Sequence, residues 1–222
     1  MMDKSKQENQ SVCNEQNTKR RGRPKCFNEQ VALEQAMLLF WQHGYEGTSI
    51  SDLTQALGIT APSLYATFGD KAALFDRCIV HYVQQEALPA EQILQNAKTA
   101  KQAVELYLYE SIRHLVQKDK PKGCMLVVAT MNCSQQNTFL QEHLKQIRLQ
   151  SRNKLLERLN LGFEQGEIAN LDKVMQLCDF YTTLLYGMTI QAIDGASADH
   201  LHSIVKNAMN MWDQIIFQSC LN

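Results

Sequence analysis

Two short helical segments on either side of a single glycine constrain this chain more than any other feature. Apolar residues recur at helical spacing from 50 to 57, and Ser49 with Asp52 three positions later forms a capping box that marks the start of a helix. Gly58 follows, and glycine readily adopts the left-handed conformation that ends a helix. The sequence therefore predicts a short helix that stops at a sharp turn.

A second amphipathic segment begins directly after this turn. Thr60 can cap it, and Pro62 is tolerated in the first turn of a helix, where a missing N–H leaves no intrahelical bond unmade. Leu64 and Phe68 are predicted to face inward because they lie four positions apart. Two such helices indicate a helix-turn-helix, whose second helix can enter a DNA major groove. Spacing alone fits a plain helical hairpin of an enzyme equally well.

The wider pattern around these helices decides between the two interpretations. It closely resembles the signature of the TetR family of bacterial transcription regulators, without a gap from about Phe27 to Leu74, at Phe40, Gly44, Tyr45, Thr48, Ser49, Ile50, Leu53, Leu57, Gly58, Ile59, Ser63, Leu64, Tyr65, Phe68, Lys71 and Leu74. The resemblance implies an all-α fold of about nine helices, with an amino-terminal helix-turn-helix DNA-binding domain and a larger ligand-binding and dimerisation domain. It also implies a ligand-responsive repressor that binds a palindromic operator as a homodimer.

Composition excludes several other classes of protein. The chain has 222 residues, of which 45% are hydrophobic and 20% charged, and this balance is typical of a folded protein. Its apolar runs are far shorter than the roughly 20 residues of a membrane span, and its polar amino terminus does not resemble a secretory signal. We therefore expect a cytoplasmic protein that does not interact with membranes.

Catalytic and metal-binding patterns are missing from the sequence. Its seven cysteines form no CxxC pair, and no His/Cys cluster has metal-site spacing. There is no phosphate-binding glycine loop, GxSxG elbow or HExxH helix. We expect no enzyme activity, no cofactor and no metal site.

A basic arm precedes the helix-turn-helix. Residues 1 to about 18 are polar and are expected to be disordered, and Lys19 to Lys25 then carries five basic residues without an acid. The alternative is a merely solvated tail, but Arg-Gly-Arg-Pro resembles the core of an AT-hook, whose arginines lie in a narrow minor groove. Between Cys26 and Leu74 one lysine stands against five acids, so the arm must supply most of the local positive charge.

The resemblance assigns DNA contacts position by position. The arm supplies Arg20, Arg21, Arg23 and Lys25; phosphate contacts are expected at Thr48, Tyr65 and Lys71; the recognition helix presents Thr60, Ala61, Pro62, Ser63 and Thr67 to the bases. No Arg or Lys on this helix can make the bidentate guanine contact. Base reading is then expected to use hydroxyls, methyl contacts and DNA shape, with an A·T-rich component read by the arm.

The rest of the chain is predicted to be helical throughout. Helices are expected near 28–43, 71–88, 98–118, 124–132, 137–165, 171–193 and 198–219, with Pro89 ending the second of these. We expect three regions: 1–26 as the tail with its arm, 27–74 as the DNA-binding domain, and 75–222 as the ligand-binding and dimerisation domain.

The last two helices carry wide apolar stripes that predict a dimer. A stripe this wide is more than one helix–helix contact needs, so each helix can pack against the domain core and a partner subunit together. The alternative is a helical hairpin that packs only within its own chain. The predicted interface residues are Leu177, Tyr181, Leu184, Met188, Ile204, Ala208, Met211, Trp212 and Ile215.

An inducer pocket is expected among the central helices, for a small molecule that the sequence does not identify. Its candidate residues are Tyr107, His114, Met125, Phe139, His143, Phe180 and Tyr181, with Tyr109, Met131 and Tyr186 also available, although core packing is the more common role for each. Cys124 follows Pro121-Lys122-Gly123 at a predicted helix start, where the helix dipole and Lys122 would favour the thiolate. Electrophile or redox sensing through Cys124 is therefore one alternative, and a buried structural thiol the other.

Two further alternatives concern the function as a whole. The weak base-reading chemistry of the recognition helix allows a helical ligand-binding or interaction protein without specific DNA binding. The arm allows an architectural protein that binds A·T-rich DNA through the arm alone.

Overall fold

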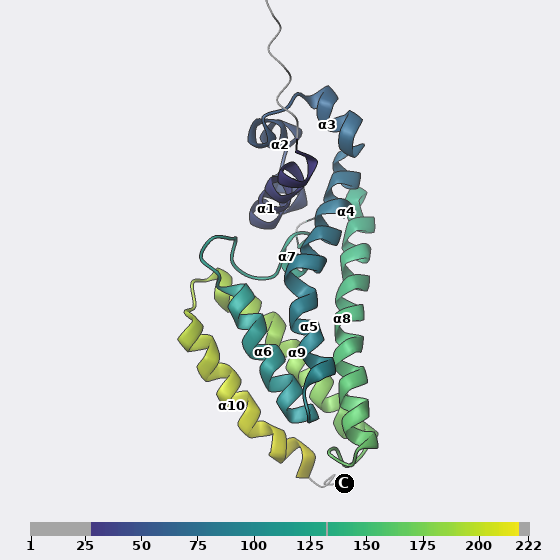
Figure 1. Ribbon diagram of the computed structural model, residues 1–222, viewed down its shortest axis with the longest axis vertical. Coiled ribbons are helices and arrows are strands. Elements are labelled where there is room, and N and C mark those ends of the chain that lie inside the picture. The colour runs from purple at the N-terminus through teal and green to yellow at the C-terminus, as the bar shows by residue number, and fades with distance from the viewer. Residues whose placement is uncertain (1–27, 132, 218–222) are drawn as a thin grey trace, which may run out of the picture.

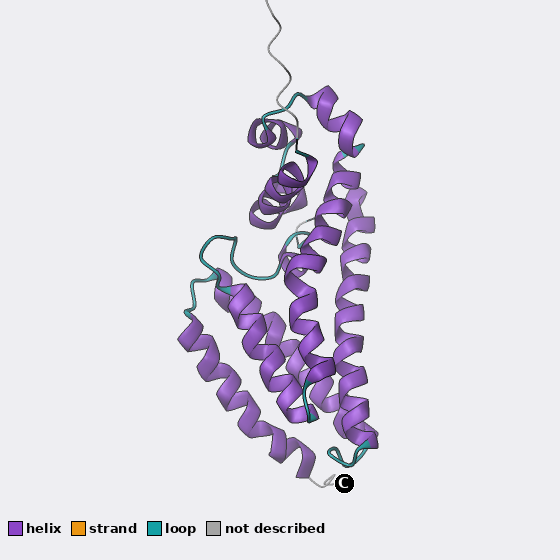
Figure 2. Ribbon diagram, in the orientation of Figure 1, coloured by secondary structure: helices purple, strands orange, loops and turns teal. Residues whose placement is uncertain are grey.

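A computed structural model describes residues 28–131 and 133–217, and this part of the chain is helical without a strand (Figures 1 and 2). Its elements are α1 (Glu29–Gly47), α2 (Ile50–Leu57), α3 (Ala61–Phe68), α4 (Lys71–Tyr82), the π-helical turn η1 (Val83–Ala87), α5 (Leu88–Asn96), α6 (Ala100–Leu115), α7 (Met125–Val128), the 3-10 turn η2 (Gln135–Asn137), α8 (Thr138–Glu164), α9 (Leu171–Ile193) and α10 (Ala198–Phe217). The all-α prediction is confirmed.

The capping residues start and stop α2 and α3 as predicted. The Ser49 hydroxyl accepts from the Asp52 N–H at 3.1 Å, and the Asp52 carboxylate accepts from the Ser49 N–H at 2.8 Å. Gly58 then takes φ 65° and ψ 30°, the left-handed conformation that lets the chain turn into α3. Leu53, Leu64 and Phe68 are buried, so both short helices are held by a shared core.

Gly44 breaks α1, as predicted, but the chain resumes a helical turn after it. Gly44 has φ 73° and ψ 172°, a conformation almost restricted to glycine. The break frees the backbone of Tyr45, whose N–H donates to the carbonyl of Ala129 at 2.9 Å. This bond ties the end of α1 to the segment that follows α7.

Pro89 does not end the helix that begins at Lys71, and that prediction is wrong. The chain continues from α4 through the five-residue π turn η1 into α5, and Pro89 lies in the first turn of α5. Proline cannot donate to the carbonyl four residues earlier, and its ring would crowd that carbonyl in a regular helix. The wider π turn accommodates this defect, and π turns are frequent at functional sites.

The helices surround two hydrophobic cores. The first is built by α1 to α4, and it also includes Met125, Leu126, Ala129, Leu140 and Leu144 of α7, α8 and the segment between them. The second lies among α5, α6, α8, α9 and α10. The first core therefore crosses the predicted boundary near residue 74, because α7 and the start of α8 pack against the helix-turn-helix region.

The long α8 runs beside α4 and α5, and α10 covers the outer side of α6 and α9 (Figure 1). α7 has only four residues where a longer helix was predicted, and the carbonyl of the next residue, Ala129, accepts the Tyr45 N–H of α1. In the described residues, no helix is both long and apolar enough to cross a membrane.

Candidate DNA-binding face and ligand cavity

α3 exposes polar side chains on one face and buries apolar side chains on the other. Leu64 is fully buried, whereas Tyr65 on the opposite side is 48% exposed. The predicted base-reading residues lie on the same outer face: Thr60, Pro62 and Ser63 are exposed, and Ala61 and Thr67 are partly exposed. The Thr67 hydroxyl donates to the Ser63 carbonyl at 2.9 Å, so it presents mainly its methyl group and an acceptor oxygen.

Thr48 does not lie where a phosphate contact was expected. Its side chain is 1% exposed, and its hydroxyl donates to the Gly44 carbonyl at 2.8 Å. The hydroxyl therefore holds the end of α1 against the start of α2 instead of facing DNA. Thr48 is one of the residues that carry the family resemblance, but its buried side chain stabilises the junction of α1 and α2.

Lys71 starts α4 beside the recognition helix. Its ammonium lies 4.2 Å from the centroid of the Tyr45 ring, and partial burial lowers its pKa from the usual value. It is the single lysine or arginine between residues 28 and 74. The arm residues Arg20, Arg21, Arg23 and Lys25 lie outside the described residues.

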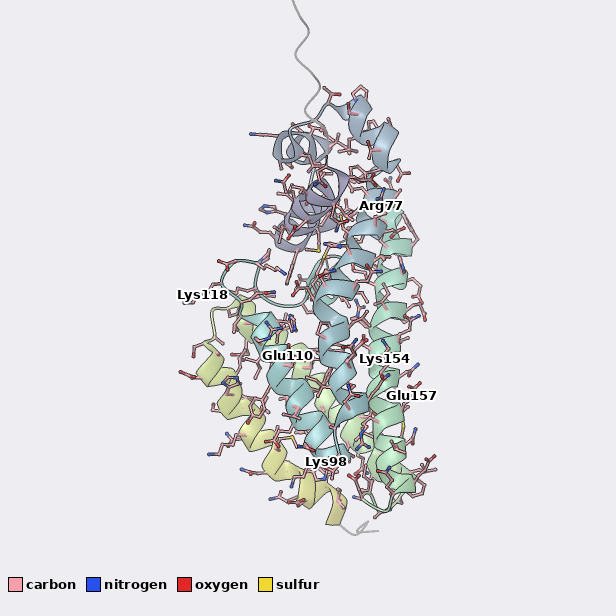
Figure 3. All side chains as sticks on the ribbon, in the orientation of Figure 1. Arg77, Lys98, Glu110, Lys118, Lys154 and Glu157 are labelled. Atoms are coloured by element: carbon pink, nitrogen blue, oxygen red, sulfur yellow. The ribbon has the colours of Figure 1, made fainter. Side chains whose placement is uncertain are left out.

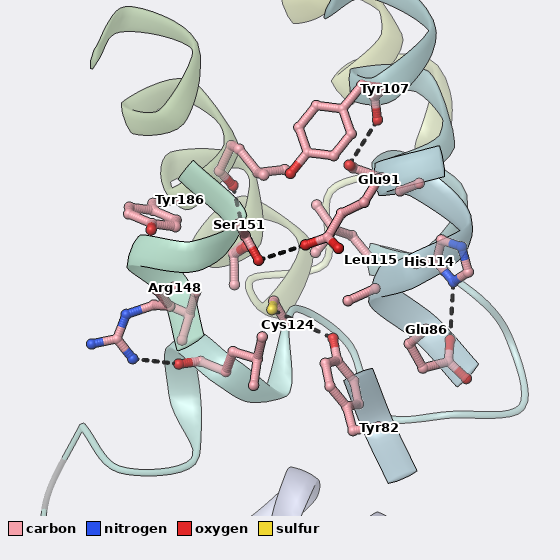
Figure 4. Close-up of a pocket in the computed structure, with 17 residues that line it drawn as sticks. Tyr82, Glu86, Glu91, Tyr107, His114, Leu115, Cys124, Arg148, Ser151 and Tyr186 are labelled. Atoms are coloured by element: carbon pink, nitrogen blue, oxygen red, sulfur yellow. Dashed lines mark hydrogen bonds and ion pairs between the residues drawn. The ribbon is translucent and has the colours of Figure 1, made fainter. Parts of the chain in front are cut away.

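A cavity of about 90 Å³ lies between α4, η1, α5, α6, α7, α8 and α9 (Figure 4). Apolar and aromatic side chains form most of its wall, including Tyr82, Tyr107, Leu115, Leu185 and Tyr186. Glu86 and Glu91 also line it, although both are more than nine-tenths buried. Neither glutamate was predicted, but Glu86 follows Tyr82 of the inner helix face by four positions, and this spacing was an available signal.

Each buried glutamate has a set of hydrogen-bonding partners. Glu86 accepts from His114 Nδ1 at 2.9 Å and Gln117 Nε2 at 3.0 Å, and it pairs with Lys120. Burial alone would raise the pKa of Glu86, but these hydrogen bonds from His114, Lys120 and Gln117 lower it to about 2. The carboxylate is therefore ionised at neutral pH.

Glu91 of α5 forms its hydrogen bonds with side chains of α8. It accepts from the Ser151 hydroxyl at 2.7 Å and pairs with Lys154 of α8, which is labelled in Figure 3. In this way the two glutamates join η1 and α5 to α6 and α8 around the cavity.

α7 connects the cavity to the helix-turn-helix region. Cys124, Leu126 and Val127 line the cavity, and two residues further on the Ala129 carbonyl accepts the Tyr45 N–H. The segment between α7 and α8 also contacts the end of α1. Glu46 Oε1 accepts at 2.8 Å from both Asn137 Nδ2 and the Ser134 N–H. The hydrogen bond from Asn137, followed by those from Ser134, lowers the pKa of Glu46 to about 2.

Comparison with known proteins identifies the family. The family model TetR_N, which describes bacterial regulatory proteins of the tetR family, matches residues 32–78. The HTH-type transcriptional repressor ComR of Escherichia coli strain K12 is 34% identical over 199 residues, which cover 89% of this chain and 95% of ComR. The chain belongs to the TetR family.

Other TetR relatives agree with this assignment. The E. coli K12 repressor BdcR is 39% identical over 106 residues, which cover 48% of this chain and 54% of BdcR. The solved structure of a cysteine variant of the TetR-family regulator CifR with 26-base-pair operator DNA is 33% identical, has a TM-score of 0.81, and covers 86% of this chain and 100% of CifR. The prediction of a DNA-binding transcription regulator is confirmed.

The cavity of this TetR protein contains only part of the predicted pocket. Tyr107, His114 and Tyr186 line it. The other predicted side chains lie elsewhere: Met125 in the first core, Phe139 and Phe180 exposed, His143 at the surface with Nδ1 3.1 Å from Asp76, and Tyr181 in the second core with its hydroxyl donating to the Ala208 carbonyl. Aromatic type and helical spacing do not reveal the direction in which a side chain points.

Cys124 has a different environment from the one predicted. Lys122 turns away from it and donates to the carbonyls of Val116 and Gln117. Burial raises the pKa of the Cys124 thiol, despite the hydrogen bonds from the Tyr82 hydroxyl at 3.4 Å and from the backbone at the start of α7. The thiol form is therefore favoured over the thiolate.

The outer face of α9 and α10 differs from the predicted dimer interface. Leu177, Tyr181, Met188, Ala208 and Trp212 are buried in the second core of their own chain. Leu184, Ile204 and Ile215 are partly buried, and Met211 is exposed. Phe180, Ile190 and Met211 are exposed large apolar side chains of these helices, as are Leu171, Met175 and Ile193.

Proposed function

We propose that this TetR protein is a cytoplasmic repressor that binds a palindromic operator as a homodimer and releases it when a small molecule occupies the cavity. The observation that carries the proposal is the exposed polar face of α3, which includes Tyr65, lies opposite buried Leu64 and Phe68, and is followed by Lys71 at the start of α4. ComR and BdcR are named as repressors, and CifR was solved with operator DNA, which supports the same role here.

The recognition chemistry is proposed to combine α3 with the arm. α3 carries hydroxyls and small apolar groups but no Arg or Lys, so it would distinguish bases through methyl contacts and hydroxyls. The arm at Arg21 and Arg23 would lie in the adjacent minor groove, where A·T-rich DNA concentrates negative potential. Tyr65 and Lys71 would contact phosphates and fix the register.

A two-fold dimer is proposed through the outer faces of α9 and α10. Phe180, Ile190 and Met211 are each 37% to 41% exposed in the single chain, and burial of such side chains is the main driving force for association. A dimer would present two copies of α3 to half-sites one or more helical turns apart.

The ligand response is proposed to travel through α7. A ligand that displaces Leu126 or Val127 would move Ala129, whose carbonyl holds Tyr45 at the break in α1. The DNA-binding unit, residues 27–74, would then reorient on the larger unit, residues 75–222. Shifting such an equilibrium from 99:1 to 1:99 requires about 5.5 kcal/mol of differential binding.

Fluorescence anisotropy with DNA from upstream of the protein's own gene tests this function. Tyr65→Ala removes an exposed aromatic phenol from the proposed phosphate face, and we expect operator affinity to fall by about tenfold, the loss of a charge-assisted hydrogen bond. Tyr109→Ala on α6 is the matched control, since this tyrosine contacts the His202 ring edge to face, far from α3. Unchanged affinity in the Tyr65 variant would instead support binding through the arm alone.

A further inference from the structure

The polar side chains around the cavity are almost all occupied by protein partners. The Ser111 hydroxyl donates to the Tyr107 carbonyl at 2.7 Å, and the Thr189 hydroxyl donates to the Leu185 carbonyl at 3.2 Å. Glu86, Glu91 and His114 bind the groups described above. A ligand that enters the cavity therefore meets few groups that are ready to bond.

Neither sign of ligand charge finds a counter-charge that is both unpaired and directed into the cavity. A cation would have to replace Lys120 at Glu86 or Lys154 at Glu91, and both ion pairs are already formed. For an anion, the guanidinium of Arg148 donates to the Leu126 carbonyl and points away from the centre of the site (Figure 4). Taking an unpaired charge out of water into such a cavity is strongly unfavourable.

Within the described part of the chain, two phenol groups of the cavity wall lack the protein hydrogen-bond partners that the other polar groups have. Among the described residues, the hydroxyls of Tyr107 and Tyr186 have no hydrogen-bond partner, although both residues line the cavity. Tyr107 is the more deeply buried of the two, and its ring points toward Glu91 and the interior of the site (Figure 4). Burial and the neighbouring Glu91 carboxylate raise the pKa of Tyr107, so its hydroxyl remains a donor at every physiological pH.

The size of the cavity limits the ligand further. Its volume is about 90 Å³, whereas an apolar cavity of about 150 Å³ holds benzene. Because the cavity is smaller than the one that holds benzene, a six-membered ring would require the wall to move, and the ligand is about the size of a five-membered ring or smaller.

We propose that the cavity binds a small uncharged molecule with an apolar body and one carbonyl or ether oxygen, which accepts a hydrogen bond from the Tyr107 hydroxyl. This assignment rests on the proposed ligand-responsive function and specifies the chemical class of its ligand. Tyr107 determines the polar end of the ligand, and Leu115, Leu185 and the ring of Tyr82 enclose its apolar body.

Four probes of similar size and different charge test the assignment on the full-length protein. Cyclopentanone carries the oxygen acceptor, cyclopentane lacks it, cyclopentylammonium is a cation and cyclobutanecarboxylate an anion. Ligand-observed NMR titration gives the Kd of each probe. We expect cyclopentanone to bind at least tenfold more tightly than either charged probe, and a charged probe that binds equally well would overturn the proposal, as would the failure of all four to bind.

Tyr107→Phe isolates the hydrogen bond, with Tyr109→Phe on the same helix but outside the cavity as the control. We expect Tyr107→Phe to raise the Kd of cyclopentanone by about two- to tenfold and to leave the Kd of cyclopentane unchanged, which also shows that the cavity is intact. An unchanged Kd for cyclopentanone refutes the role of Tyr107.

The same probes, added to the operator complex, separate this inference from the proposed function. If cyclopentanone binds in the cavity but never weakens operator binding at saturation, the ligand response is wrong and the ligand class stands. If the charged probes bind preferentially and release DNA, the ligand class is wrong and the ligand response stands.

Discussion

Replacement of Glu86 by glutamine tests how the cavity wall is held together. The pKa of Glu86 falls from 4.5 to about 2 in the folded protein, and one pKa unit corresponds to about 1.4 kcal/mol. The ionised carboxylate would thus contribute about 3 kcal/mol to the free energy of unfolding. Lys120, one of its partners, is 29% exposed, and solvent screening of that pair reduces the expected value to about 2 to 3 kcal/mol.

The sign of the pH dependence follows from the direction of this change. A carboxyl group whose pKa is lower in the folded state binds protons more weakly there than in the unfolded chain, so protonation favours unfolding. The contribution of Glu86 is therefore complete above about pH 5 and declines as the pH falls toward 2, its pKa in the folded protein.

Urea unfolding of the wild type and Glu86→Gln measures the difference, at one fixed protein concentration because the dimer's stability depends on it. We expect a difference of about 2 to 3 kcal/mol at pH 7 that shrinks by roughly 1 kcal/mol at pH 4. Glu142→Gln, which breaks an exposed pair with Lys145, is the control and should change little. Equal stability of the Glu86 variant and the wild type at pH 7 would refute the reasoning.

Three further predictions concern α1, the thiol and the arm. Gly44→Ala should destabilise the protein by about 1 to 3 kcal/mol, because Gly44 has φ 73° and a new Cβ would lie 3.3 Å from the Ala129 carbonyl oxygen; thermal unfolding checks this against Gly47→Ala, whose Cβ meets only His43 at 3.6 Å, and similar losses in both would contradict it. Cys124 should react slowly with iodoacetamide at pH 7 and faster as the pH rises past its usual pKa, because burial favours the thiol; mass spectrometry locates the adduct, and rapid labelling at pH 7 would revive thiol-based sensing. Deletion of residues 19–25, with their five basic side chains, should reduce the slope of log K against log salt by roughly 4 to 5 per subunit; anisotropy titrations measure it, and an unchanged slope would remove the arm from the interface.

Local signals in the sequence were enough for the helix-turn-helix. Ser49, Asp52 and Gly58 act on backbone groups within a few residues of themselves, so their effect does not depend on the rest of the fold. Leu64 and Phe68 faced inward as predicted because a two-turn helix on a small core has one possible buried side.

The ligand site could not be predicted in the same way. Its wall combines residues of α4, η1, α5, α6, α7, α8 and α9, and the spacing along each helix does not determine how those helices are rotated against one another. Tyr107 and Tyr181 are both tyrosines of the second core, yet only Tyr107 also lines the cavity. The continuation through Pro89 also depended on a π turn that brings Glu86 toward His114 and Lys120.

The sequence by itself thus determined the helices, their caps, the family and the residues of the recognition helix, since these depend on interactions between neighbours in the chain. Tertiary packing decided that Thr48 is internal, that Cys124 remains a thiol, and that Leu177 and Trp212 belong to the core of one subunit. These properties depend on which side of a helix is desolvated, and that is fixed only when the helices pack against each other.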